Sequence, residues 1–203
     1  NNVESTRFFG NTYMEINPMK SLTFRSMFAL DRTDTRDGLY QDYQSVGRLQ
    51  SAAGSYISAE NRIQTSFTWE NTMNYKTDFG GSSSNLTAML GHSMTQGVAE
   101  YRKVSGNTAA EHFYQSSFYD LRNITTPVLS NGYTNNAMLS YFGRLNLSVM
   151  DKYLFTASFR ADGSSVLAAG NKWGYFPSVS GAWRLSEESF LKDTNWLNNL
   201  KFR

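Results

Sequence analysis

Residues 140–193 read SYFGRLNLSVMDKYLFTASFRADGSSVLAAGNKWGYFPSVSGAWRLSEESFLKD, and about every second side chain in this stretch is apolar or aromatic. A β-strand imposes such a period of two, because its side chains alternate between the two faces of a sheet. Three alternating runs follow one another, at 137–149, 153–162 and 173–185. Each run has one apolar face and one polar face, which predicts consecutive strands of a two-faced sheet.

Composition favours such a sheet over an ordinary globular core. The chain has 203 residues, of which 40% are hydrophobic and 15% are aromatic, and its mean hydropathy is −0.48. The apolar content is therefore concentrated in large rings. No window approaches the roughly 18 consecutive apolar residues of a transmembrane helix, whereas each strand of a membrane barrel gives only a weak signal. A helical membrane protein is excluded and a membrane barrel is not.

Charge and cysteine content exclude several classes of function. The net charge of +2 is spread along the chain and forms no basic stripe, so we expect no nucleic-acid partner. The absence of cysteine excludes a disulfide scaffold and a thiolate metal site. The first ten residues, NNVESTRFFG, lack the pattern of a secretory signal. We therefore expect either a mature chain or an internal piece of a longer one.

The rest of the chain reads as further strands joined by connections of two lengths. Alternating runs at 8–16 and 22–31 predict a first hairpin, because only a tight turn separates them. Runs at 63–75 and 86–92 predict a second hairpin. Two long segments, 32–61 and 96–135, lack a sustained period and predict long loops. After the three runs described above, a helical turn is expected within 186–199, and 200–203 begins a further strand.

The connections alternate between short and long, which predicts two different sides of the sheet. Outer-membrane barrels place short turns on the periplasmic side and long loops outside, and their strands run about ten residues with apolar side chains facing lipid. A soluble β-sandwich also alternates apolar and polar residues, but its connections have no reason to sort by length. We favour the barrel and keep a soluble carbohydrate-binding sandwich as an alternative. The sandwich predicts that Phe155 and Phe159 are buried.

The stretch 140–193 resembles one family in particular, the SusC/RagA-like TonB-dependent outer-membrane transporters of Bacteroidetes-type bacteria. The motifs occur in the family's order and spacing, and the last third of the chain matches most specifically. Where many members carry Arg-Phe-Gly after the paired serines, this chain has Val166, Leu167 and Ala168. The motifs are SYFGRLNL (140–147), DKYLFTASFRADGSS (151–165), NKWGYFPSVSGAWRLSEE (171–188), FLKD followed by WLNNLKFR, and, more moderately, RFFGNTYMEINPMKSLTFRS (7–26).

The resemblance implies an all-β fold, an antiparallel up-and-down meander that is a segment of a large transmembrane β-barrel of about 22 strands. Residues 1–203 are then part of a single barrel domain, with the plug domain and the remaining strands outside this chain. It implies TonB-dependent uptake of oligosaccharides or peptides across the cell outer membrane. The implied partners are outer-membrane lipid, a SusD-like surface lipoprotein and the TonB complex. A receptor for siderophore, haem or cobalamin is the first alternative.

The sequence offers no catalytic motif, and we expect neither an enzyme nor a cofactor. There is no nucleophile elbow, HExxH, P-loop or dinucleotide-binding motif. The two histidines, His92 and His112, are 20 positions apart and have no acidic or cysteine partner at ligand spacing, so we expect no metal site. Glu187 and Glu188 are adjacent, and a solvated rim explains them better than an acid/base pair.

Three groups of residues carry the functional expectations. Aromatic side chains of the apolar face are expected to face lipid or form a girdle at the membrane interfaces: Trp69, Tyr75, Tyr153, Phe155, Phe159, Trp173, Tyr175 and Trp183. Charged side chains of the other face are expected to line the lumen and contact a plug: Arg25, Arg62, Glu70, Arg144, Arg160, Asp162 and Arg184. Loop tyrosines are better candidates for ligand contact than the strand aromatics, although packing against neighbouring loops is the favoured role for each: Tyr40, Tyr43, Tyr101, Tyr114 and Tyr119.

Overall fold

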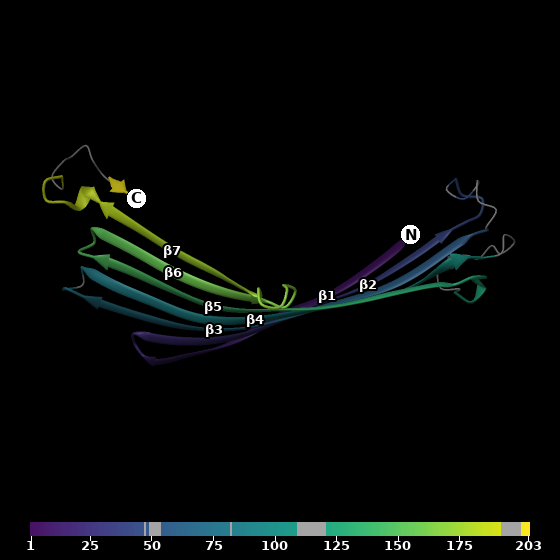
Figure 1. The fold of residues 1–203 in the computed structure, drawn as a ribbon, viewed down its shortest axis with the longest axis horizontal. Helices are drawn as coiled ribbons and strands as arrows, with labels where there is room; N and C mark the ends of the chain where they lie inside the picture. Colours follow the sequence, from purple (N-terminus) through teal and green to yellow (C-terminus); the bar gives the residue numbers. More distant parts are fainter. Residues whose placement is uncertain (47, 49–53, 82, 109–120, 192–199) are drawn as a thin grey trace. The chain divides into compact units, whose positions relative to one another are not determined.

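The computed structural model describes residues 1–46, 48, 54–81, 83–108, 121–191 and 200–203. Its eight strands form one sheet in chain order, β1 to β8, so each strand lies beside its neighbour in sequence (Figure 1). Strand β5 pairs antiparallel with β6, β6 with β7, and β7 with β8. The strands are β1 (Asn2–Met19), β2 (Leu22–Gln41), β3 (Tyr56–Phe79), β4 (Ser84–Asn107), β5 (Val128–Val149), β6 (Tyr153–Ser164), β7 (Trp173–Arg184) and β8 (Lys201–Phe202).

This architecture confirms the predicted meander and its seven strands with the start of an eighth. The described residues also include two single-turn 3₁₀ helices, Leu121–Asn123 and Leu185–Glu187, and the second matches the helical turn predicted within 186–199. Residues 192–199 of that segment lie outside the described residues. Within the described part of the chain, no helix has the length and hydropathy to cross a membrane.

Strands β2 to β5 are much longer than the sequence predicts. The segments 32–41, 56–61, 96–107 and 128–135 were expected to be loop, and the structure places them in strands of 20 to 24 residues. The prediction was wrong there because these segments carry polar side chains on both faces. Such a strand shows no alternation in hydropathy, which is the signal that the sequence argument used.

Short turns set the order of the strands. Pro18 lies inside β1, one position before its end, although the sequence placed the first turn at Asn17 and Pro18. The β3–β4 turn uses Gly80 and Gly81, both with positive φ, as a tight connection requires.

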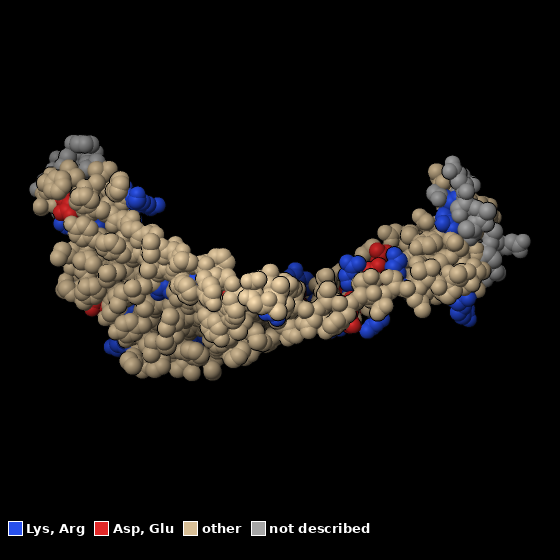
Figure 2. Space-filling view, in the orientation of Figure 1, with Lys and Arg blue, Asp and Glu red and all other residues tan. Residues whose placement is uncertain are grey.

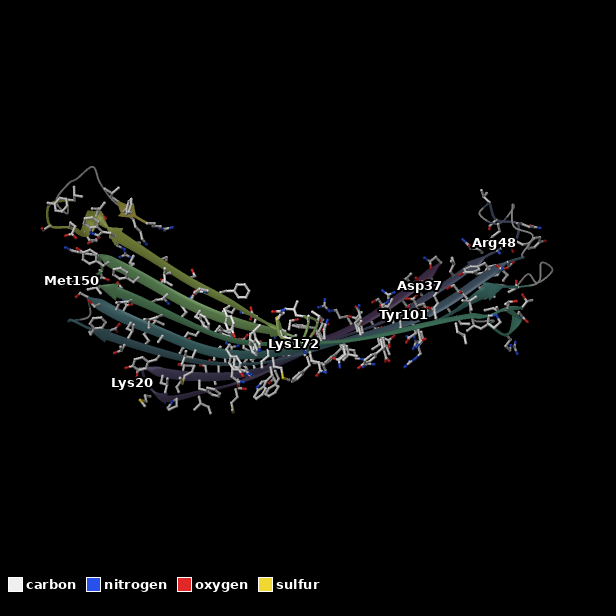
Figure 3. The ribbon with its side chains drawn as sticks, in the orientation of Figure 1. Lys20, Asp37, Arg48, Tyr101, Met150 and Lys172 are labelled. Carbon is white, nitrogen blue, oxygen red and sulfur yellow. The ribbon has the colours of Figure 1, made fainter. Side chains whose placement is uncertain are left out.

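The β5–β6 turn is held by the neighbouring turn. Met150 and Asp151 have φ values of 54° and 56°, a region that costs a non-glycine residue about 1–2 kcal/mol. The Met150 N–H donates to Ser84 Oγ at 2.9 Å, and the Asp151 N–H donates to the Ser83 carbonyl at 2.8 Å. Figure 3 shows Met150 at the tip of this turn. These bonds from the β3–β4 turn fix the left-handed backbone in place.

The chain divides into two compact units that share the long strands. Unit 1 comprises Asn1–Gly10, Leu30–Phe67 and Gln96–Asn136, and unit 2 comprises Asn11–Ala29, Thr68–Thr95 and Ala137–Arg203. Unit 1 contains the buried apolar side chains Ile57 and Ile124, whereas unit 2 contains only Ala161 among the described residues. Unit 2 is therefore a sheet whose large apolar side chains remain on its surface.

The single sheet contradicts the soluble-sandwich alternative. A sandwich needs two packed sheets with a shared apolar interior, and it predicts that Phe155 and Phe159 are buried. All eight strands instead belong to one sheet, and these two rings are 52% and 50% exposed. A sheet with this much apolar surface needs another apolar environment on that face.

Candidate functional site

The register of β5, β6 and β7 sorts their side chains onto two faces. Directly opposite residues of antiparallel strands share a face, and Phe155 lies opposite Leu147 on β5 and Gly181 on β7. The intervening positions form the other face, where Ser158 lies opposite Arg144 and Ser178. We call these the aromatic face and the polar face. On β5 to β7 the aromatic face carries Tyr141, Leu145, Leu147, Tyr153, Phe155, Phe159, Trp173, Tyr175, Val179 and Trp183.

A row of rings crosses the aromatic face of unit 2. Phe28 of β2 stacks on Trp69 of β3, with ring centroids 5.7 Å apart and planes 8° from parallel. Trp69 meets His92 of β4 edge to face at 5.7 Å, and His92 meets Tyr141 of β5 at 5.3 Å. Tyr141 then stacks with Trp173 of β7 at 6.2 Å. Offset and edge contacts of this kind are the preferred aromatic geometries, so the row is a continuous contact across strands far apart in sequence.

A second aromatic pair lies at the turn end of the same strands. Tyr153 and Trp183 lie directly opposite each other and stack with centroids 6.2 Å apart. Ten positions along β6, Gly163 lies opposite Trp173, and a Cβ atom on this glycine would come within 3.0 Å of the indole ring. Gly163 thus leaves room for Trp173 to lie across β6 toward Tyr141.

The spacing of these two aromatic levels matches a bilayer. Ten strand residues span about 33 Å at roughly 3.3 Å per residue. A strand tilt of about 35–45°, usual in membrane barrels, reduces this to about 23–27 Å along the membrane normal. The apolar band of outer-membrane barrels is about 25 Å tall and is flanked by aromatic girdles. The aromatic face of unit 2 therefore has the dimensions of a membrane-spanning wall.

Glu188 accepts hydrogen bonds from three side chains beside the Tyr153–Trp183 pair. Its Oε1 atom accepts hydrogen bonds from the Tyr153 hydroxyl and the Trp183 indole N–H, both at 3.0 Å. Its Oε2 atom pairs with Lys152 Nζ at 2.9 Å. The hydrogen bond from Lys152, followed by those from Trp183 and Tyr153, holds the pKa of Glu188 below its usual range. We call these four side chains the Glu188 clamp.

Three arginines share one recurring arrangement, Arg7 and Arg62 in unit 1 and Arg160 on the polar face of unit 2. Each guanidinium lies over an aromatic ring and also pairs with a carboxylate on the same face. Exposed pairs of this kind add little stability, but they hold the planar donor group in a fixed orientation. The three sets are Arg7 with Phe9 (5.8 Å) and Asp31 (2.6 Å), Arg62 with Tyr101 (5.9 Å) and Glu60 (2.7 Å), and Arg160 with Phe142 (5.6 Å) and Asp162 (2.8 Å).

One hollow on the polar face lies beside Arg160. In unit 2, a hollow of about 460 Å³ is lined by Glu70, Arg144, Arg160 and Phe142. Arg160 also donates to Ser140 Oγ at 3.2 Å, which joins β6 to β5. A surface with charges of both signs and fixed donors suits polar, hydrated contacts and is unsuited to hydrocarbon.

The described residues offer no candidate metal site. No group of three or more His, Cys, Asp or Glu side chains in the described ranges is placed to hold a metal ion. His92 lies between Trp69 and Tyr141 in the aromatic row. His112 lies outside the described residues.

Comparison with known proteins agrees with this geometry. No protein-family model matches the chain. The TonB-dependent receptor P26 of Formosa agariphila is 30% identical over 203 residues, which cover 97% of this chain and 20% of the relative. The TonB-dependent receptor SusC of Bacteroides thetaiotaomicron is 53% identical over 70 residues, 34% of this chain and 7% of SusC. A solved structure of the RagAB peptide transporter superposes with a TM-score of 0.83, at 22% identity over 98% of this chain and 22% of that one. The chain belongs to the SusC/RagA-like TonB-dependent receptors.

This SusC/RagA-like chain spans about a fifth of the length of the P26 receptor, so it corresponds to one part of a receptor of that size. The RagAB likeness lies below 25% identity and supports the fold, an antiparallel meander of the barrel type. The family and the fold class predicted from residues 140–193 are thus confirmed.

The predicted face residues of the SusC/RagA-like chain separate cleanly by contact and by alternation. On β3, Trp69 belongs to the aromatic row, so Tyr75 shares its face and Glu70 lies on the other. Trp69 Nε1 of β3 donates to Ser26 Oγ of β2, so Ser26 lies on the face of Trp69. Arg25 is next to Ser26 in β2 and therefore lies on the opposite face, where its guanidinium carbon is 4.0 Å from the centroid of the Tyr13 ring. Which face meets lipid and which meets a lumen stays a prediction. The charged residues predicted to line the lumen are Arg25, Arg62, Glu70, Arg144, Arg160, Asp162 and Arg184.

Three of the five candidate ligand tyrosines lie within the described residues. Tyr40 and Tyr101 are strand residues of β2 and β4, so the expectation that they lie in loops was wrong. The Tyr40 hydroxyl is 3.4 Å from Ser55 Oγ, and the Tyr43 backbone N–H donates to the same oxygen at 3.0 Å. The Tyr101 ring, labelled in Figure 3, covers Gly132 so closely that no side chain fits there.

The contacts of these tyrosines fit packing between strands, while ligand contact is untested. Tyr114 and Tyr119, the other two candidates, lie outside the described residues.

Sequence reasoning missed the partners that complete each surface. Phe28 and His92 join the aromatic row, and Phe142 supplies a ring on the polar face. A signal existed for Phe142, which is the large apolar residue at a polar-face position of its run. No local signal existed for Glu188, because its donors come from positions 152, 153 and 183.

The clamp leads to a prediction for the Glu188→Gln variant of the full-length receptor. Loss of the charge should weaken the bonds from Lys152, Trp183 and Tyr153, since hydrogen bonds to a charged acceptor are the stronger ones. The pKa of Glu188 is lowered, so its stabilisation is complete above the ordinary value of about 4.3 and is lost as the pH falls through the lowered pKa.

The Trp183 indole N–H resonance, followed against pH, should report both effects. The exposed neighbour Glu187 provides the control variant, Glu187→Gln. An equal response of the Trp183 resonance to both variants would show that the clamp does not exist.

Proposed function

We propose that this chain forms barrel wall and extracellular loops of an outer-membrane transporter that takes up oligosaccharides or peptides in a TonB-dependent manner. Residues 1–203 belong to a single barrel domain in this proposal, with the plug and remaining strands supplied elsewhere in the protein. The aromatic face contacts outer-membrane lipid, and the polar face lines the lumen.

The observation that carries the proposal is the pair of aromatic levels on a sheet with one apolar face. Their separation of about 25 Å fits the apolar band of an outer-membrane barrel. The opposite face carries the arginine sets and the hollow beside Arg144 and Glu70, which suit contact with water, a plug or polar cargo. A membrane-facing surface and a hydrated surface on one sheet support a transport wall.

The relatives support the choice of cargo and partners. RagAB is described as a peptide transporter, and SusC is described as a TonB-dependent receptor. We therefore propose peptides or oligosaccharides as cargo, energy supply by a TonB complex, and a SusD-like lipoprotein as the surface partner. Fixed guanidinium groups such as that of Arg160 suit carboxylates and hydroxyls of both cargo classes.

Iron-chelate uptake is the second candidate. The receptor BauA, described as the ferric preacinetobactin receptor of Acinetobacter baumannii, superposes with a TM-score of 0.53 at 12% identity. A likeness at that identity concerns the fold alone. The higher identity to SusC and P26, and the TM-score of 0.83 with the RagAB peptide transporter, favour the first proposal over siderophore uptake.

Uptake by cells that carry the complete receptor tests the proposal. Labelled oligosaccharides, labelled peptides and a labelled ferric siderophore should be offered separately to wild-type cells, to cells lacking the receptor and to cells lacking TonB. We expect accumulation of an oligosaccharide or a peptide to require both the receptor and TonB. Receptor-dependent accumulation of the siderophore alone would favour the second candidate, and accumulation that survives loss of TonB would contradict both.

A further inference from the structure

A second, smaller hollow, of about 250 Å³, lies within unit 1. Gly97 and Ala99 of β4 line it, between side chains of β2, β3 and β5. Sites that enclose a whole drug-sized ligand have roughly 300–1,000 Å³, so this hollow suits one ring or one side chain of a larger molecule. Its polar lining residues are Asp31, Thr33, Gln64, Ser66, Thr134 and Asn136.

Strand alternation places the hollow on the face that carries Arg62. The Arg62 guanidinium of β3 lies over the Tyr101 ring of β4, and this ring covers Gly132 of β5, so the three residues share a face. Every second residue along a strand keeps to one face. Gln64 therefore shares the face of Arg62, and Asn136 shares that of Gly132. Arg62 is among the residues predicted to line the lumen, so the hollow belongs to the same predicted surface.

Small residues of β4 form the floor of the hollow. A Cβ atom at Gly97 would come within 2.6 Å of Asn136 Oδ1, so the Asn136 amide reaches into the space that the glycine leaves. Two positions further along β4, Ala99 adds only a methyl group, and its carbonyl accepts a hydrogen bond from the Thr134 hydroxyl at 3.3 Å. A larger side chain at position 97 would displace the Asn136 amide and fill the hollow.

The described lining of the hollow offers no unpaired charge. Asp31 is the one charged side chain among the described residues that line it. Arg7 donates to both carboxylate oxygens of Asp31, at 2.8 and 2.6 Å. Figure 2 likewise shows acidic side chains beside basic ones in the region where Figure 1 labels β1 and β2. An ionised group that entered the hollow would lose hydration and find no free counter-charge, which is unfavourable.

The uncharged groups of the hollow suit hydroxyls. Gln64 and Asn136 each carry an amide that has two N–H donors and an acceptor oxygen. In the described part of the chain neither amide has a hydrogen-bond partner, so both are available to a ligand. Ser66 adds a hydroxyl, which can donate and accept. Sugar hydroxyls also do both, so neighbouring hydroxyls of one ring can pair with these groups.

We propose that this hollow is a subsite for one neutral sugar ring, and that of the two cargo classes named above this chain selects the oligosaccharide. The inference rests on the proposed function, in which the polar face lines the lumen. Gln64 and Asn136 are then residues that determine specificity. Neutral oligosaccharides should bind in preference to those with uronic acid or sulfate groups, because the hollow has no free cation for an anionic substituent.

Arrays of defined oligosaccharides and of short peptides, probed with the labelled full-length receptor in detergent, test the proposal. The oligosaccharides are neutral ones of glucose, mannose, galactose, xylose and fructose, and acidic ones with uronic acid or sulfate. We expect signal on neutral oligosaccharides. The strongest of these is then titrated calorimetrically, and the double variant Gln64→Ala with Asn136→Ala should bind it at least about ten-fold more weakly, since two hydrogen bonds are lost.

The matched control is the double variant Gln96→Ala with Asn135→Ala. Gln96 is next to Gly97 on β4 and Asn135 is next to Asn136 on β5, so alternation puts both on the opposite face. There the Gln96 amide donates to Asn135 Oδ1 at 3.2 Å. This variant removes the same two types of side chain and should bind the sugar as wild type does. Gly97→Leu, which fills the hollow, should lose binding as the first double variant does.

Three results would overturn the inference. They are absence of neutral-oligosaccharide binding by the wild type, equal affinity of the two double variants, and binding of peptides that is lost in Gln64→Ala with Asn136→Ala. Retention of the barrel's heat-modifiable mobility in gels verifies that the variants fold. The last result would make the hollow a peptide subsite and leave TonB-dependent uptake intact. Sugar binding without TonB-dependent accumulation would instead contradict the proposed function alone, because neither the arrays nor the titration depends on uptake.

Discussion

Phe159→Lys should prevent stable insertion of the receptor into the outer membrane. Phe159 lies on the aromatic face of β6, opposite Gly143 and Pro177, and its ring stacks with Tyr175 at a centroid distance of 6.2 Å. It is six positions from the Tyr153 level and four from the Gly163 level, which puts it near the middle of the apolar band. A lysine near the bilayer midplane of a barrel costs about 2–4 kcal/mol. Folding titrations of the full-length receptor into lipid vesicles should measure this loss.

The cost should depend on depth. Phe155 is on the same face of the same strand but only two positions from Tyr153, close to one aromatic level. A lysine there can extend its amine to the interface, so Phe155→Lys should cost less than Phe159→Lys. This ordering distinguishes a lipid surface from a protein contact, since a buried protein interface has no reason to follow membrane depth.

Ser158→Lys is the matched control on the adjacent position. Ser158 lies on the polar face opposite Arg144, where water screens the new charge. Like charges on directly opposite positions cost less than about 1 kcal/mol in a sheet. Equal losses for Phe159→Lys and Ser158→Lys would contradict the assignment of faces, and a larger loss for Ser158→Lys would reverse it.

The sequence predicts those strands that have one apolar face and one polar face. The alternation in 140–193 predicted three strands, and the register places Phe155 with Leu147 and Gly181 on one face as that alternation requires. A difference in hydropathy between neighbouring residues exists only where one face is apolar. The prediction therefore worked for β6 and β7, which have 12 residues each.

The same reasoning explains why the long strands were missed. In β2 the residues Thr33, Asp34, Thr35 and Arg36 are polar on both faces, so the strand continues with no change in hydropathy from one residue to the next. Hydrogen bonding to neighbouring strands maintains it, and that pairing leaves no mark in a single sequence.

For the candidate site, the sequence predicts which face of the sheet a residue lies on, but it does not predict which side chains the residue contacts. Arg160 and Asp162 could be placed on one face because they are two positions apart in a strand, and they do form an ion pair. The ring under Arg160 belongs to Phe142 on the neighbouring strand, and that pairing depends on the register. The same holds for Glu188, which seemed a solvated rim residue and is instead the acceptor for three side chains.

Ile57→Ala should open the distal ends of β3 and β4 in unit 1. Ile57 is completely buried and lies beside Ser55, which is also inaccessible to solvent. The Thr108 N–H donates to the Ser55 carbonyl at 2.8 Å, and Arg48 donates to the Gly54 carbonyl and to Asn107 Oδ1. Truncation of a buried isoleucine to alanine costs about 2–5 kcal/mol. We expect a loss in this range for the local structure.

Local opening is the proper measure of this loss, because a membrane barrel as a whole unfolds too slowly for a simple equilibrium. Hydrogen exchange at the Thr108 amide of the full-length receptor should accelerate about 30-fold or more, since each 1.4 kcal/mol corresponds to a factor of ten. Val46→Ala is the control, because Val46 is 90% exposed and its truncation removes no buried contact.

The Thr108 amide tests the cooperative unit directly, since its acceptor is the Ser55 carbonyl and the Ser55 hydroxyl also accepts a hydrogen bond from the Tyr43 backbone N–H. Acceleration at Thr108 in Ile57→Ala would show that the framework around Ser55, which also binds the Tyr43 backbone, depends on Ile57, whereas unchanged exchange would separate Ile57 from that framework.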